Sequence, residues 1–334
     1  MERYSRQTLF SPIGKEGQNK LLNSTVLIVG VGALGTVISN HLVRAGVGNV
    51  RIVDRDFVEW SNLQRQMLFD ESDAEQSLPK AIAAKHKLEA INQTVNIEAI
   101  VDHVNAENID QLVEDVDVIL DGTDNLSTRF LLNDVSFKKG IPFAYGGVVA
   151  SRGMTAFFEP GQTPCLRCLM SPTADRGQTC DTVGVISPIV DIVASLQVTE
   201  TLKFLTGNNK NIVRALKSFD TWFNQSYDLT FNGAKENCLT CQVGEFPSLE
   251  RKAREETVLC GRDSVQISRE TTFDLDELEN QLDQIGEVSR TPFLLKATID
   301  DSKTFVIFEN GRIIVQGTED INQAKSWYDR YIGY

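Results

Sequence analysis

Four cysteines are the residues of this chain whose spacing most directly indicates chemistry. They form two Cys-x-x-Cys pairs, Cys165/Cys168 and Cys238/Cys241, with residues 169–237 between them. Four thiolates make a suitable tetrahedral shell for Zn²⁺, and an all-cysteine site leaves no open position for catalysis. A redox pair or free thiols are the alternatives, but redox pairs of the thioredoxin type occur singly beside a βαβ unit. The pattern therefore predicts a structural Zn²⁺ site that joins two distant segments.

A glycine-rich turn is the second feature, with glycines at Gly30, Gly32 and Gly35. Glycine lets the backbone turn tightly and lets a phosphate approach the N-terminus of the following helix, where free N–H groups and the helix dipole favour an anion. Asp54 follows at about the separation at which a carboxylate holds a ribose hydroxyl in dinucleotide sites. These residues alone fit an NAD site, or a glycine turn that binds nothing.

Polar and cationic residues after Asp54 change the nucleotide that the pattern favours. They are Asn62, Gln64, Arg65, Lys80 and the pair Asp124-Asn125. A triphosphate that is about to lose pyrophosphate needs cations, because charge builds on the bridging oxygen, whereas an NAD site needs no such cluster. A carboxylate at Asp124 suits a Mg²⁺ ion that bridges phosphate oxygens. Each residue has an ordinary alternative, such as a solvated charge or a helix cap, but their joint order favours ATP with Mg²⁺.

Alternating strands and helices must position these residues. Short apolar runs predict strands at 26–30, 49–54, 95–101, 116–121 and 141–145. Apolar periodicity predicts one helix after the glycine turn and others at 80–91, 128–139 and 187–205. The run at 26–30 is wholly apolar, which is typical of a strand buried on both faces. The alternation predicts a doubly wound, Rossmann-like α/β sheet that is mostly parallel and carries the zinc site.

The apolar pattern in the last part of the chain predicts a separate small α+β module. Leu275, Leu278, Leu282 and Ile285 recur at helical spacing. Two apolar runs flank Asn310-Gly311, which is a strong β-hairpin signal, and a final helix carries Ala324, Trp327, Tyr328 and Tyr331 on one face. We therefore expect an ATP-binding domain at 1–244 and a C-terminal module of unknown role at 245–334.

Charge and hydropathy exclude some classes of partner. Acidic residues outnumber basic ones by 46 to 33, and the formal net charge of −13 disfavours nucleic acid or an anionic membrane as a general partner. The N-terminus has no apolar signal segment, and no run approaches the length of a transmembrane helix. We expect a cytoplasmic protein with no membrane contact.

Several motifs, taken in order, resemble one known family. They are Arg3-Tyr4-Ser5-Arg6-Gln7, Ser61-Asn62-Leu63-Gln64-Arg65-Gln66, Thr123-Asp124-Asn125 and Thr179-Cys180, and the match extends to Cys241. The chain resembles the MoeB/ThiF family, bacterial relatives of the ubiquitin-activating enzymes. The resemblance implies ATP- and Mg²⁺-dependent adenylation of the C-terminal glycine of a small ubiquitin-fold sulfur carrier with a Gly-Gly tail. It also implies a homodimer, and a sulfurtransferase or cysteine desulfurase as sulfur donor.

The resemblance also implies roles for individual residues. Asp54 would hold the ribose, while Asn62, Arg65 and Lys80 would bind the phosphates. Asp124 would serve the metal and the acyl transfer, and Arg6 would reach the ATP of the other subunit as an arginine finger. The remaining residues expected to contact the nucleotide are Gly30, Gly32, Ala33, Gly35, Ser61, Leu63, Gln64 and Asn125. Ala33 departs from the family, whose members often carry another glycine there.

Two further cysteines have less certain chemistry. In some relatives a cysteine at the position of Cys180 takes up the activated carrier covalently, and in others it is dispensable. Arg176 nearby favours a lowered thiol pKa, and an inert thiol is the alternative. Cys260 precedes the main helix of the C-terminal module, so we interpret it as a small buried hydrophobe and not as the persulfide cysteine of a rhodanese domain.

The motifs do not decide which sulfur carrier protein is the substrate, so two biosynthetic pathways stay open. The absence of a rhodanese tail and the uncertain role of Cys180 favour the small subunit of molybdopterin synthase, and thus molybdenum cofactor biosynthesis. The thiamine sulfur carrier is the alternative. Two other classes compete: an NAD-dependent dehydrogenase, for which the three histidines offer no acid–base candidate, and a non-catalytic scaffold that binds a carrier. The intact set Arg6, Arg65, Lys80 and Asp124 argues against the scaffold.

Overall fold

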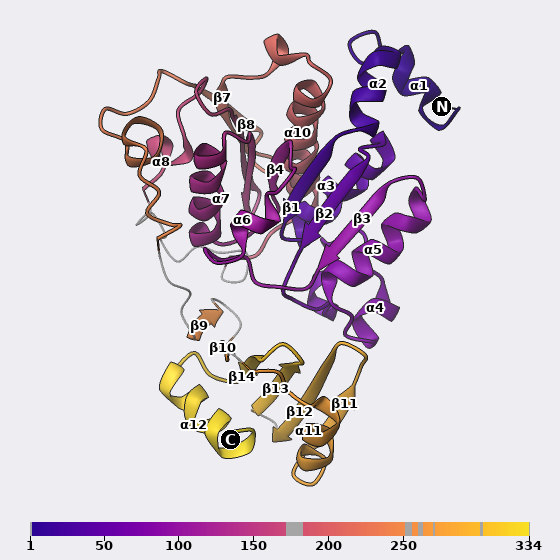
Figure 1. Ribbon diagram of the computed structural model, residues 1–334, viewed down its shortest axis with the longest axis vertical. Helices are drawn as coiled ribbons and strands as arrows, with labels where there is room; N and C mark the ends of the chain where they lie inside the picture. The colour runs from indigo at the N-terminus through magenta and orange to yellow at the C-terminus, as the bar shows by residue number, and fades with distance from the viewer. Residues whose placement is uncertain are drawn as a thin grey trace. The chain divides into compact units, whose positions relative to one another are not determined.

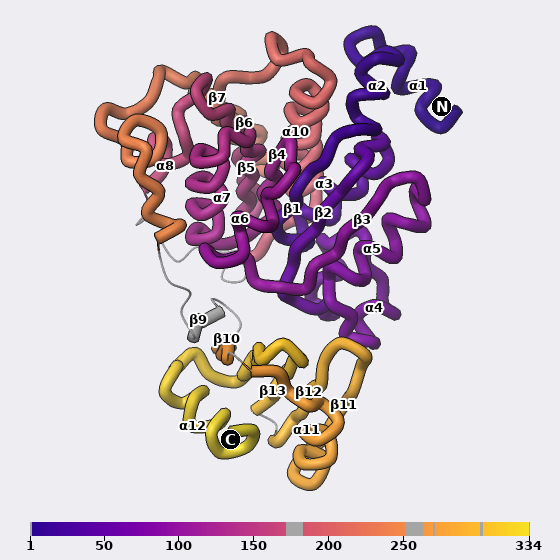
Figure 2. The backbone as a smooth tube through the Cα atoms, viewed as in Figure 1, coloured from indigo at the N-terminus to yellow at the C-terminus, as the bar shows by residue number. Residues whose placement is uncertain are grey.

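The structure, a computed structural model, describes residues 2–171, 183–250, 263–269, 271–300 and 303–333, together with the backbone of 256–259. The chain divides into two compact units, Met1–Lys252 and Ala253–Tyr334. Figure 2 follows the backbone from the indigo N-terminus to the yellow C-terminus, and the last part of the chain forms the second unit by itself.

An eight-stranded sheet forms the centre of the first unit. Its strands are β1 (Thr25–Val29), β2 (Asn49–Val53), β3 (Asn96–Ile100), β4 (Val118–Asp121), β5 (Phe143–Val149), β6 (Arg152–Phe158), β7 (Ala215–Asp220) and β8 (Gln225–Thr230). Their spatial order is β3-β2-β1-β4-β5-β6-β7-β8. The first five strands are parallel, and the last three join antiparallel. The predicted doubly wound, mostly parallel α/β sheet is confirmed.

Helices cover both faces of this sheet, which explains why its central strands are continuously apolar (Figure 1). The first face packs against α3 (Ala33–Ala45), α5 (Lys80–Ile91) and α10 (Ser187–Leu205). The second face packs against α6 (Ile109–Leu112) and α7 (Leu126–Lys139). All four residues of β4 are buried, and side chains alternate along β1, where Ile28 faces the first group of helices and Leu27 the second.

The strand order has a topological switch point where β1 meets β4. The chain leaves β1 for α3 on one face and leaves β4 for α7 on the other, so the connections diverge between these two neighbours. In open α/β sheets, ligands bind at the carboxyl ends of strands at such a switch point. Val29 and Asp121 are register partners at this end, so the segments that follow both strands lie side by side.

Shorter elements complete the first unit. They are η1 (Glu2–Tyr4), α1 (Ser5–Leu9), α2 (Gly14–Leu22), η2 (Trp60–Asn62), α4 (Glu71–Glu75), α8 (Leu166–Leu169), η3 (Asn209–Asn211) and the single π-helical turn η4 (Leu239–Val243). The buried Tyr4 fixes the N-terminal segment, because its hydroxyl accepts a hydrogen bond of 2.9 Å from Asn92 Nδ2.

The second unit is a six-stranded antiparallel sheet with two helices. Its strands are β9 (Glu256–Leu259), β10 (Ser264–Ser268), β11 (Glu287–Arg290), β12 (Leu294–Asp300), β13 (Lys303–Phe308) and β14 (Arg312–Gln316), in the order β11-β12-β13-β14-β10-β9. The helices α11 (Leu275–Leu282) and α12 (Ile321–Tyr331) contribute apolar side chains to the same core as the sheet. The hairpin at Asn310-Gly311 joins β13 to β14, as its sequence predicts.

One part of the helical pattern in this unit is wrong. Ile285 was grouped with the helix by spacing, but α11 ends at Leu282, and Ile285 is exposed. Gly286 follows, where a side chain would lie 2.4 Å from the Thr298 carbonyl oxygen, so the turn at this point packs closely against β12 before β11 begins. The apolar spacing therefore continued by chance beyond the helix end.

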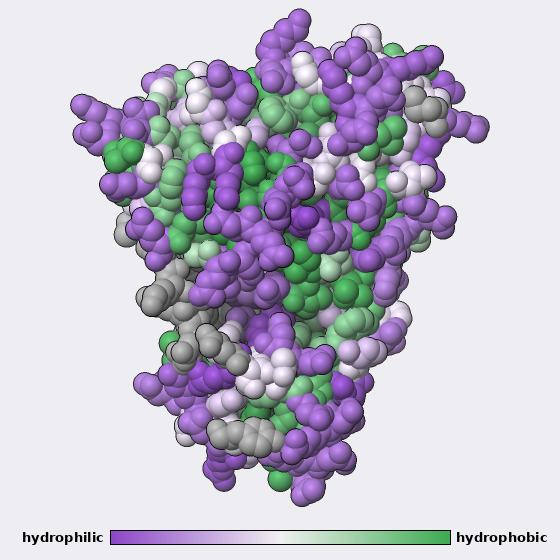
Figure 3. Space-filling model, in the orientation of Figure 1, coloured by the Kyte–Doolittle hydropathy of each residue, from purple (hydrophilic) through white to green (hydrophobic). Residues whose placement is uncertain are grey.

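The surface agrees with the acidic, polar composition. Figure 3 shows one face on which hydrophilic side chains cover most of the area, with smaller apolar areas between them. In the part of the chain that the structure describes, no helix combines the length and hydrophobicity needed to cross a bilayer.

Candidate nucleotide site and cysteine cluster

Three glycines hold the turn after β1 tightly against the end of β4. Gly30 has a φ of +86°, and a Cβ there would lie 2.8 Å from the carbonyl group of Gly122. A Cβ on Gly35 would approach the Gly30 carbonyl oxygen to 1.9 Å, and one on Gly122 would approach the same oxygen to 2.2 Å. Because backbone meets backbone at all three positions, no other residue fits without moving the turn.

The turn ends at the N-terminus of α3. Gly32 is the N-cap of this helix and Ala33 is its first residue, so no side chain caps the first N–H groups. Uncapped N–H groups at a helix N-terminus, together with the helix dipole, bind anions. Ala33 already carries its methyl group within the helix, so the departure from glycine at this position leaves the turn intact.

Asp54 lies directly beyond β2 and faces the same turn. Its Oδ2 accepts a hydrogen bond of 2.6 Å from the Val31 backbone N–H, and its Oδ1 accepts one of 2.7 Å from the Asp56 N–H. Burial raises the pKa of the Asp54 carboxyl, and the positive charge of Lys80 opposes that rise. The carboxylate thus lies at the carboxyl ends of β1 and β2.

Lys80 is buried, although lysine is seldom fully buried without a partner. It is the first residue of α5, as predicted, and its Nζ lies 3.7 Å from Asp56 Oδ2. Its backbone N–H also donates to the Asp56 carbonyl oxygen at 2.8 Å. Asp56 was not singled out in the sequence, where it is one of many acidic residues, but it fixes the ammonium group near Asp54.

The segment Glu59–Gln66 forms a compact turn around η2. Asn62 is buried, and its Oδ1 accepts from the Glu59 N–H at 3.1 Å. Arg65 Nη1 donates to the Ser61 carbonyl oxygen at 2.9 Å, which orients a partly exposed guanidinium. Gln64 is exposed, and Leu63 packs against the core. Part of this motif therefore builds the turn and part of it remains available to a ligand.

A buried ion pair supports the loop after β4. Asp121 accepts hydrogen bonds from the Thr123 N–H (2.9 Å), the Thr123 hydroxyl (2.6 Å) and Arg129 Nε (3.1 Å). Arg129 Nη2 then donates to the Thr123 carbonyl oxygen at 2.7 Å. Burial raises the pKa of the Asp121 carboxyl, and the guanidinium opposes that rise. Neither residue could be singled out from the sequence, because a strand-end Asp and a helical Arg have no motif of their own.

Asp124 is exposed at the tip of this supported loop. The next residue, Asn125, is the N-cap of α7, and its Oδ1 accepts from the Thr128 N–H at 2.8 Å. The helix-cap alternative considered for Asp124 therefore belongs to its neighbour. Asp124 keeps its carboxylate in solvent, and Asn125 is committed to the helix through its side-chain oxygen.

The other predicted catalytic residues lie elsewhere. Arg6 is an exposed residue of α1, and no hydrogen bond or ion pair within the described residues joins it to the residues around the glycine turn. Cys180 and Cys260 fall outside the residues that the structure describes.

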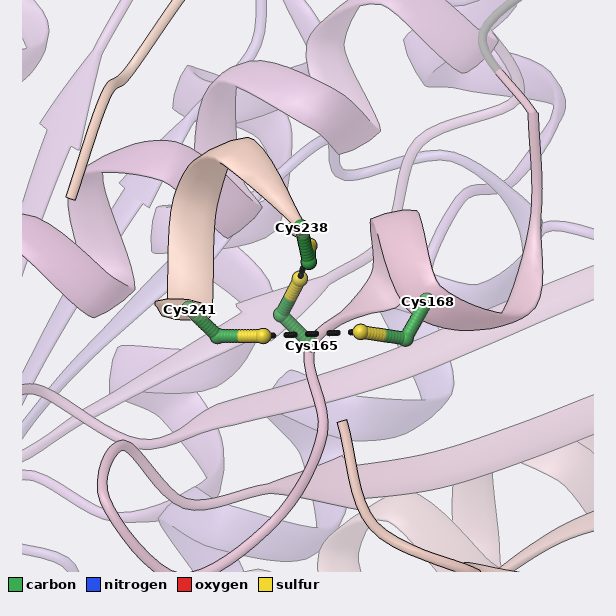
Figure 4. A group of neighbouring side chains, drawn as sticks. All are labelled: Cys165, Cys168, Cys238 and Cys241. Atoms are coloured by element: carbon green, nitrogen blue, oxygen red, sulfur yellow. Dashed lines mark hydrogen bonds between the residues drawn. The ribbon is translucent and has the colours of Figure 1, made fainter. Parts of the chain in front are cut away.

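The four predicted zinc ligands come together (Figure 4). Their sulfur atoms all lie within 4.8 Å of one another, with 3.5 Å between the Cys165 and Cys238 sulfurs and 3.4 Å between those of Cys168 and Cys241. Tetrahedral Zn–S bonds of about 2.3 Å require S–S separations of roughly 3.8 Å, so the donor set fits Zn²⁺. Burial raises the pKa of the Cys165 thiol and raises that of Cys241 to about 12. A bound cation would favour the thiolates instead.

A polar network fixes both cysteine pairs to α7. The buried Asp134 carboxylate accepts from Arg167 at 3.0 and 2.7 Å, from the Thr240 hydroxyl at 2.8 Å and from the Ser248 N–H at 2.9 Å. Arg167 lies within the first Cys-x-x-Cys pair and Thr240 within the second. One carboxylate on α7 therefore holds the middle of both pairs. The sequence analysis missed this network, which only the fold brings together.

Comparison with known proteins identifies the family that this fold and these sites define. The model of the ThiF family matches residues 4–240, and the chain belongs to this family. The chain is 47% identical, over 99% of its own length and 99% of the other, to the sulfur carrier protein ThiS adenylyltransferase of Bacillus subtilis. It is 34% identical to a sulfur carrier protein adenylyltransferase of Thermus thermophilus, over 78% of this chain and 97% of the relative.

The fold also has solved counterparts. The crystal structure of E. coli MccB with ATP superimposes with a TM-score of 0.63, over 72% of this chain and 74% of the other, at 22% identity. At this identity the likeness shows the fold alone.

These comparisons test the family, the enzyme class and the MoeB-like preference that the sequence suggested. The resemblance to the MoeB/ThiF family is confirmed, and the chain is an adenylyltransferase. The preference for a MoeB-like enzyme is not supported, because the relative that matches over the whole length is named a ThiS adenylyltransferase.

Proposed function

We propose that this enzyme transfers AMP from ATP to the C-terminal carboxylate of the thiamine sulfur carrier, a small ubiquitin-fold protein with a Gly-Gly tail. The main support for this proposal is the 47% identity to a ThiS adenylyltransferase over 99% of both chains. This identity favours the thiamine sulfur carrier, the alternative from the sequence, over the molybdopterin synthase subunit. The preference for the molybdopterin carrier depended partly on Cys180, which lies outside the residues that the structure describes.

The C-terminal unit supports the same choice. The ThiF family model ends at residue 240, and the Thermus thermophilus relative aligns with 78% of this chain. The Bacillus subtilis relative aligns with 99% of it, so its similarity includes the six-stranded sheet and its two helices. The unit thus accompanies the adenylating unit in the relative that is named for ThiS.

ATP would bind at the switch point between β1 and β4. The uncapped N-terminus of α3 suits a phosphate, and Asp54 at the end of β2 suits a ribose hydroxyl. Arg65 and the buried Lys80 supply positive charge on the same side of the sheet. Asp124, exposed on a loop that Asp121 and Arg129 hold in place, would take the Mg²⁺ ion.

The proposed reaction needs no protein nucleophile. A carboxylate oxygen of the carrier attacks the α-phosphorus of ATP, the bond from that phosphorus to the bridging oxygen breaks, and pyrophosphate leaves. The carrier keeps AMP as an acyl-adenylate. The carboxylate is already ionised at neutral pH, so the work of the enzyme is positioning and stabilising charge on the leaving pyrophosphate.

A second subunit would complete the site. Arg6 is exposed on α1, and two neighbouring apolar residues, Leu9 and Phe10, are 74% and 61% exposed. Within the described residues, no ion pair holds the Arg6 guanidinium. Exposed apolar side chains beside an exposed arginine support a homodimer in which Arg6 reaches the partner's ATP.

Zinc and sulfur complete the proposal. A structural Zn²⁺ ion would be held by Cys165, Cys168, Cys238 and Cys241, and it would join two distant segments of the first unit. Cys180 is the candidate acceptor of the activated carrier, with a sulfurtransferase or cysteine desulfurase as donor. A Cys180→Ala enzyme that supports sulfur transfer at the wild-type rate would remove that thiol from the mechanism.

Exchange of labelled pyrophosphate into ATP tests the proposal directly. We expect exchange that depends on the thiamine sulfur carrier and that the small subunit of molybdopterin synthase does not support. Exchange with the molybdopterin carrier alone would restore the first expectation. Absence of exchange with both carriers, in folded and zinc-loaded protein, would favour a non-catalytic scaffold.

A further inference from the structure

Gly32 is the one residue of the glycine turn whose identity the packing of the chain does not explain. Side chains at Gly30 and Gly35 would collide with backbone, as described above. A Cβ on Gly32 would meet a single atom within 4 Å among the described residues, Gln66 Nε2 at 3.8 Å, and the φ of Gly32 is an ordinary −84°. A side chain here would therefore meet no backbone, although the Gly32 ψ of −142° lies outside the regions that L-residues favour. The missing side chain therefore leaves space in front of the α3 N-terminus.

Gln66, beside this space, has a side-chain oxygen whose hydrogen bonding the described residues do not explain. Its side chain is 3% exposed, and its Oε1 has no hydrogen-bond partner among the described residues. The backbone is well held, because its N–H donates to the Asn62 carbonyl oxygen at 3.0 Å and its carbonyl accepts from Phe69 at 3.1 Å. Burying a carboxamide oxygen without a partner is unfavourable. Native proteins tolerate such groups mainly where a ligand or water satisfies them.

These two unexplained features face each other, and one ligand would account for both. The ligand must fit the space beside Gly32, offer an acceptor to Nε2 and offer a donor to Oε1. A nucleotide does so, because its phosphate oxygens accept and its ribose hydroxyls donate. Inorganic phosphate at neutral pH offers mainly acceptors and leaves Oε1 unsatisfied.

We propose that Gln66 is a nucleotide-binding residue whose carboxamide donates to a phosphate oxygen of ATP at the α3 N-terminus and accepts from a ribose hydroxyl. The inference rests on the proposed function, since it takes ATP as the ligand. It adds a second buried, neutral side chain, beside Asn62, to the contacts expected at this site. It also predicts that Gln66 destabilises the free protein and stabilises the complex.

Gln18 provides a matched control within the same unit. It is also fully buried, but its Nε2 donates to the Ala45 carbonyl oxygen at 3.0 Å and its Oε1 accepts from Gln7 Nε2 at 2.7 Å. Replacing Gln18 by methionine removes satisfied hydrogen bonds, whereas replacing Gln66 by methionine removes an unsatisfied group of the same size. The two variants therefore separate ligand binding from internal structure.

The experiment measures the melting temperature without nucleotide and the ATP dissociation constant, by titration with Mg²⁺ and ATP, for the full-length protein. For Gln66→Met we expect a melting temperature equal to or above wild type, with ATP affinity reduced roughly tenfold or more. For Gln18→Met we expect a lower melting temperature and unchanged ATP affinity. Gln66→Glu keeps the shape and places a carboxylate beside the phosphates, so its loss of affinity should be at least as large.

Two results would overturn the inference, and they differ from failure of the proposed function. Wild-type affinity for ATP in Gln66→Glu would show that no phosphate lies beside the carboxamide. A Gln66→Met protein that melts as low as Gln18→Met and binds ATP as wild type would make Gln66 a structural residue. If the wild-type protein itself does not bind ATP, the adenylation proposal fails and this inference fails with it.

Discussion

The cysteine cluster and the nucleotide site are both polar, partly buried regions beside α7, but their polar groups are satisfied to different degrees. At the cluster, the Asp134 carboxylate receives five hydrogen bonds, and the two Cys-x-x-Cys pairs face one another with no open position. At the nucleotide site, the α3 N-terminus has no cap, the Gln66 oxygen has no partner among the described residues, and Asp124 points to solvent.

The polar groups of the cysteine cluster find their hydrogen-bond partners within the protein, whereas those of the nucleotide site need a substrate to supply them. Satisfied polar groups contribute to stability, and their loss leaves a buried partner alone. Unsatisfied groups cost stability until a ligand arrives. Substitutions in the two regions should therefore affect different measurements, and four experiments test whether they do.

The largest expected effect is on stability at the cluster. Asp134→Ala leaves the Arg167 guanidinium buried without its carboxylate, which should cost about 3–5 kcal/mol of unfolding free energy. Denaturant unfolding at fixed zinc measures the loss, with metal content determined in parallel. Asp124→Ala is the control, and it should change the unfolding free energy by less than about 0.5 kcal/mol because Asp124 is exposed. Equal losses in both variants would contradict the comparison.

The next effect is on catalysis alone. Arg65→Ala and Asp124→Ala should each reduce carrier-dependent pyrophosphate exchange by at least roughly a hundredfold, because Arg65 supplies positive charge for the leaving pyrophosphate and Asp124 would hold the Mg²⁺ ion that does the same. Their melting temperatures should stay close to wild type, since both side chains reach solvent. Exchange at wild-type rate in either variant would remove that residue from the proposed mechanism.

A smaller effect on catalysis is expected at Arg129, whose own hydrogen bonds are satisfied but which supports the loop of the nucleotide site. Arg129→Lys keeps a positive charge but cannot bond both the Asp121 carboxylate and the Thr123 carbonyl oxygen, so the loop that carries Asp124 loses a support. We expect exchange to fall by about tenfold, the effect of roughly 1.4 kcal/mol. The matched control is Arg51→Lys, whose guanidinium bonds Glu98 and the Leu112 carbonyl oxygen away from the switch point. Similar exchange in both variants would reduce Arg129 to a general stabilising residue.

The smallest effect concerns pH. Burial raises the pKa of Asp54 above its ordinary value of 3.8, so its proton is held more tightly in the folded protein than in the unfolded chain. The stability that this proton contributes is present below pH 3.8 and is lost as the pH rises through the folded pKa. ATP binding through the ribose has the opposite dependence, because it needs the carboxylate.

ATP affinity should therefore weaken on acidification at a higher pH than an ordinary aspartate would cause. Titrations with ATP between pH 7.5 and the lowest pH at which the protein stays folded measure this change. Asp54→Asn should bind weakly with a flat profile over the same range. An identical slope in wild type and Asp54→Asn would assign the pH dependence to another group.

The sequence predicted most elements that carry apolar periodicity or a capping pattern. The helices at 80–91 and 187–205 have the predicted bounds, and the Asn310-Gly311 hairpin forms as expected. Strand β6 was not predicted, because Arg152–Phe158 follows β5 after a short turn and its role as an antiparallel partner depends on the neighbouring strand. Local pattern identifies an element, whereas pairing with a distant strand depends on the whole fold.

The residues of the candidate site divide in the same way, into those that a local motif identifies and those that depend on the whole fold. Residues with a motif, such as Asp54, Lys80 and the four cysteines, could be named from the sequence alone. Asp121, Arg129 and Asp134 act through partners that the fold brings to them, and their types and spacing are common in any helix or strand end. Only the structure distinguishes such residues from solvated charges.

The interlocked glycines Gly30, Gly35 and Gly122 have a consequence for mutational tolerance. In a scan of all single substitutions scored separately for protein abundance and for growth that requires the enzyme, every side chain at these three positions should reduce both scores, because each would strike backbone in the folded chain. At Gly32, where a Cβ would meet no backbone, substitutions should reduce growth more than abundance. One short motif would thus split into positions constrained by folding and a position constrained by the substrate.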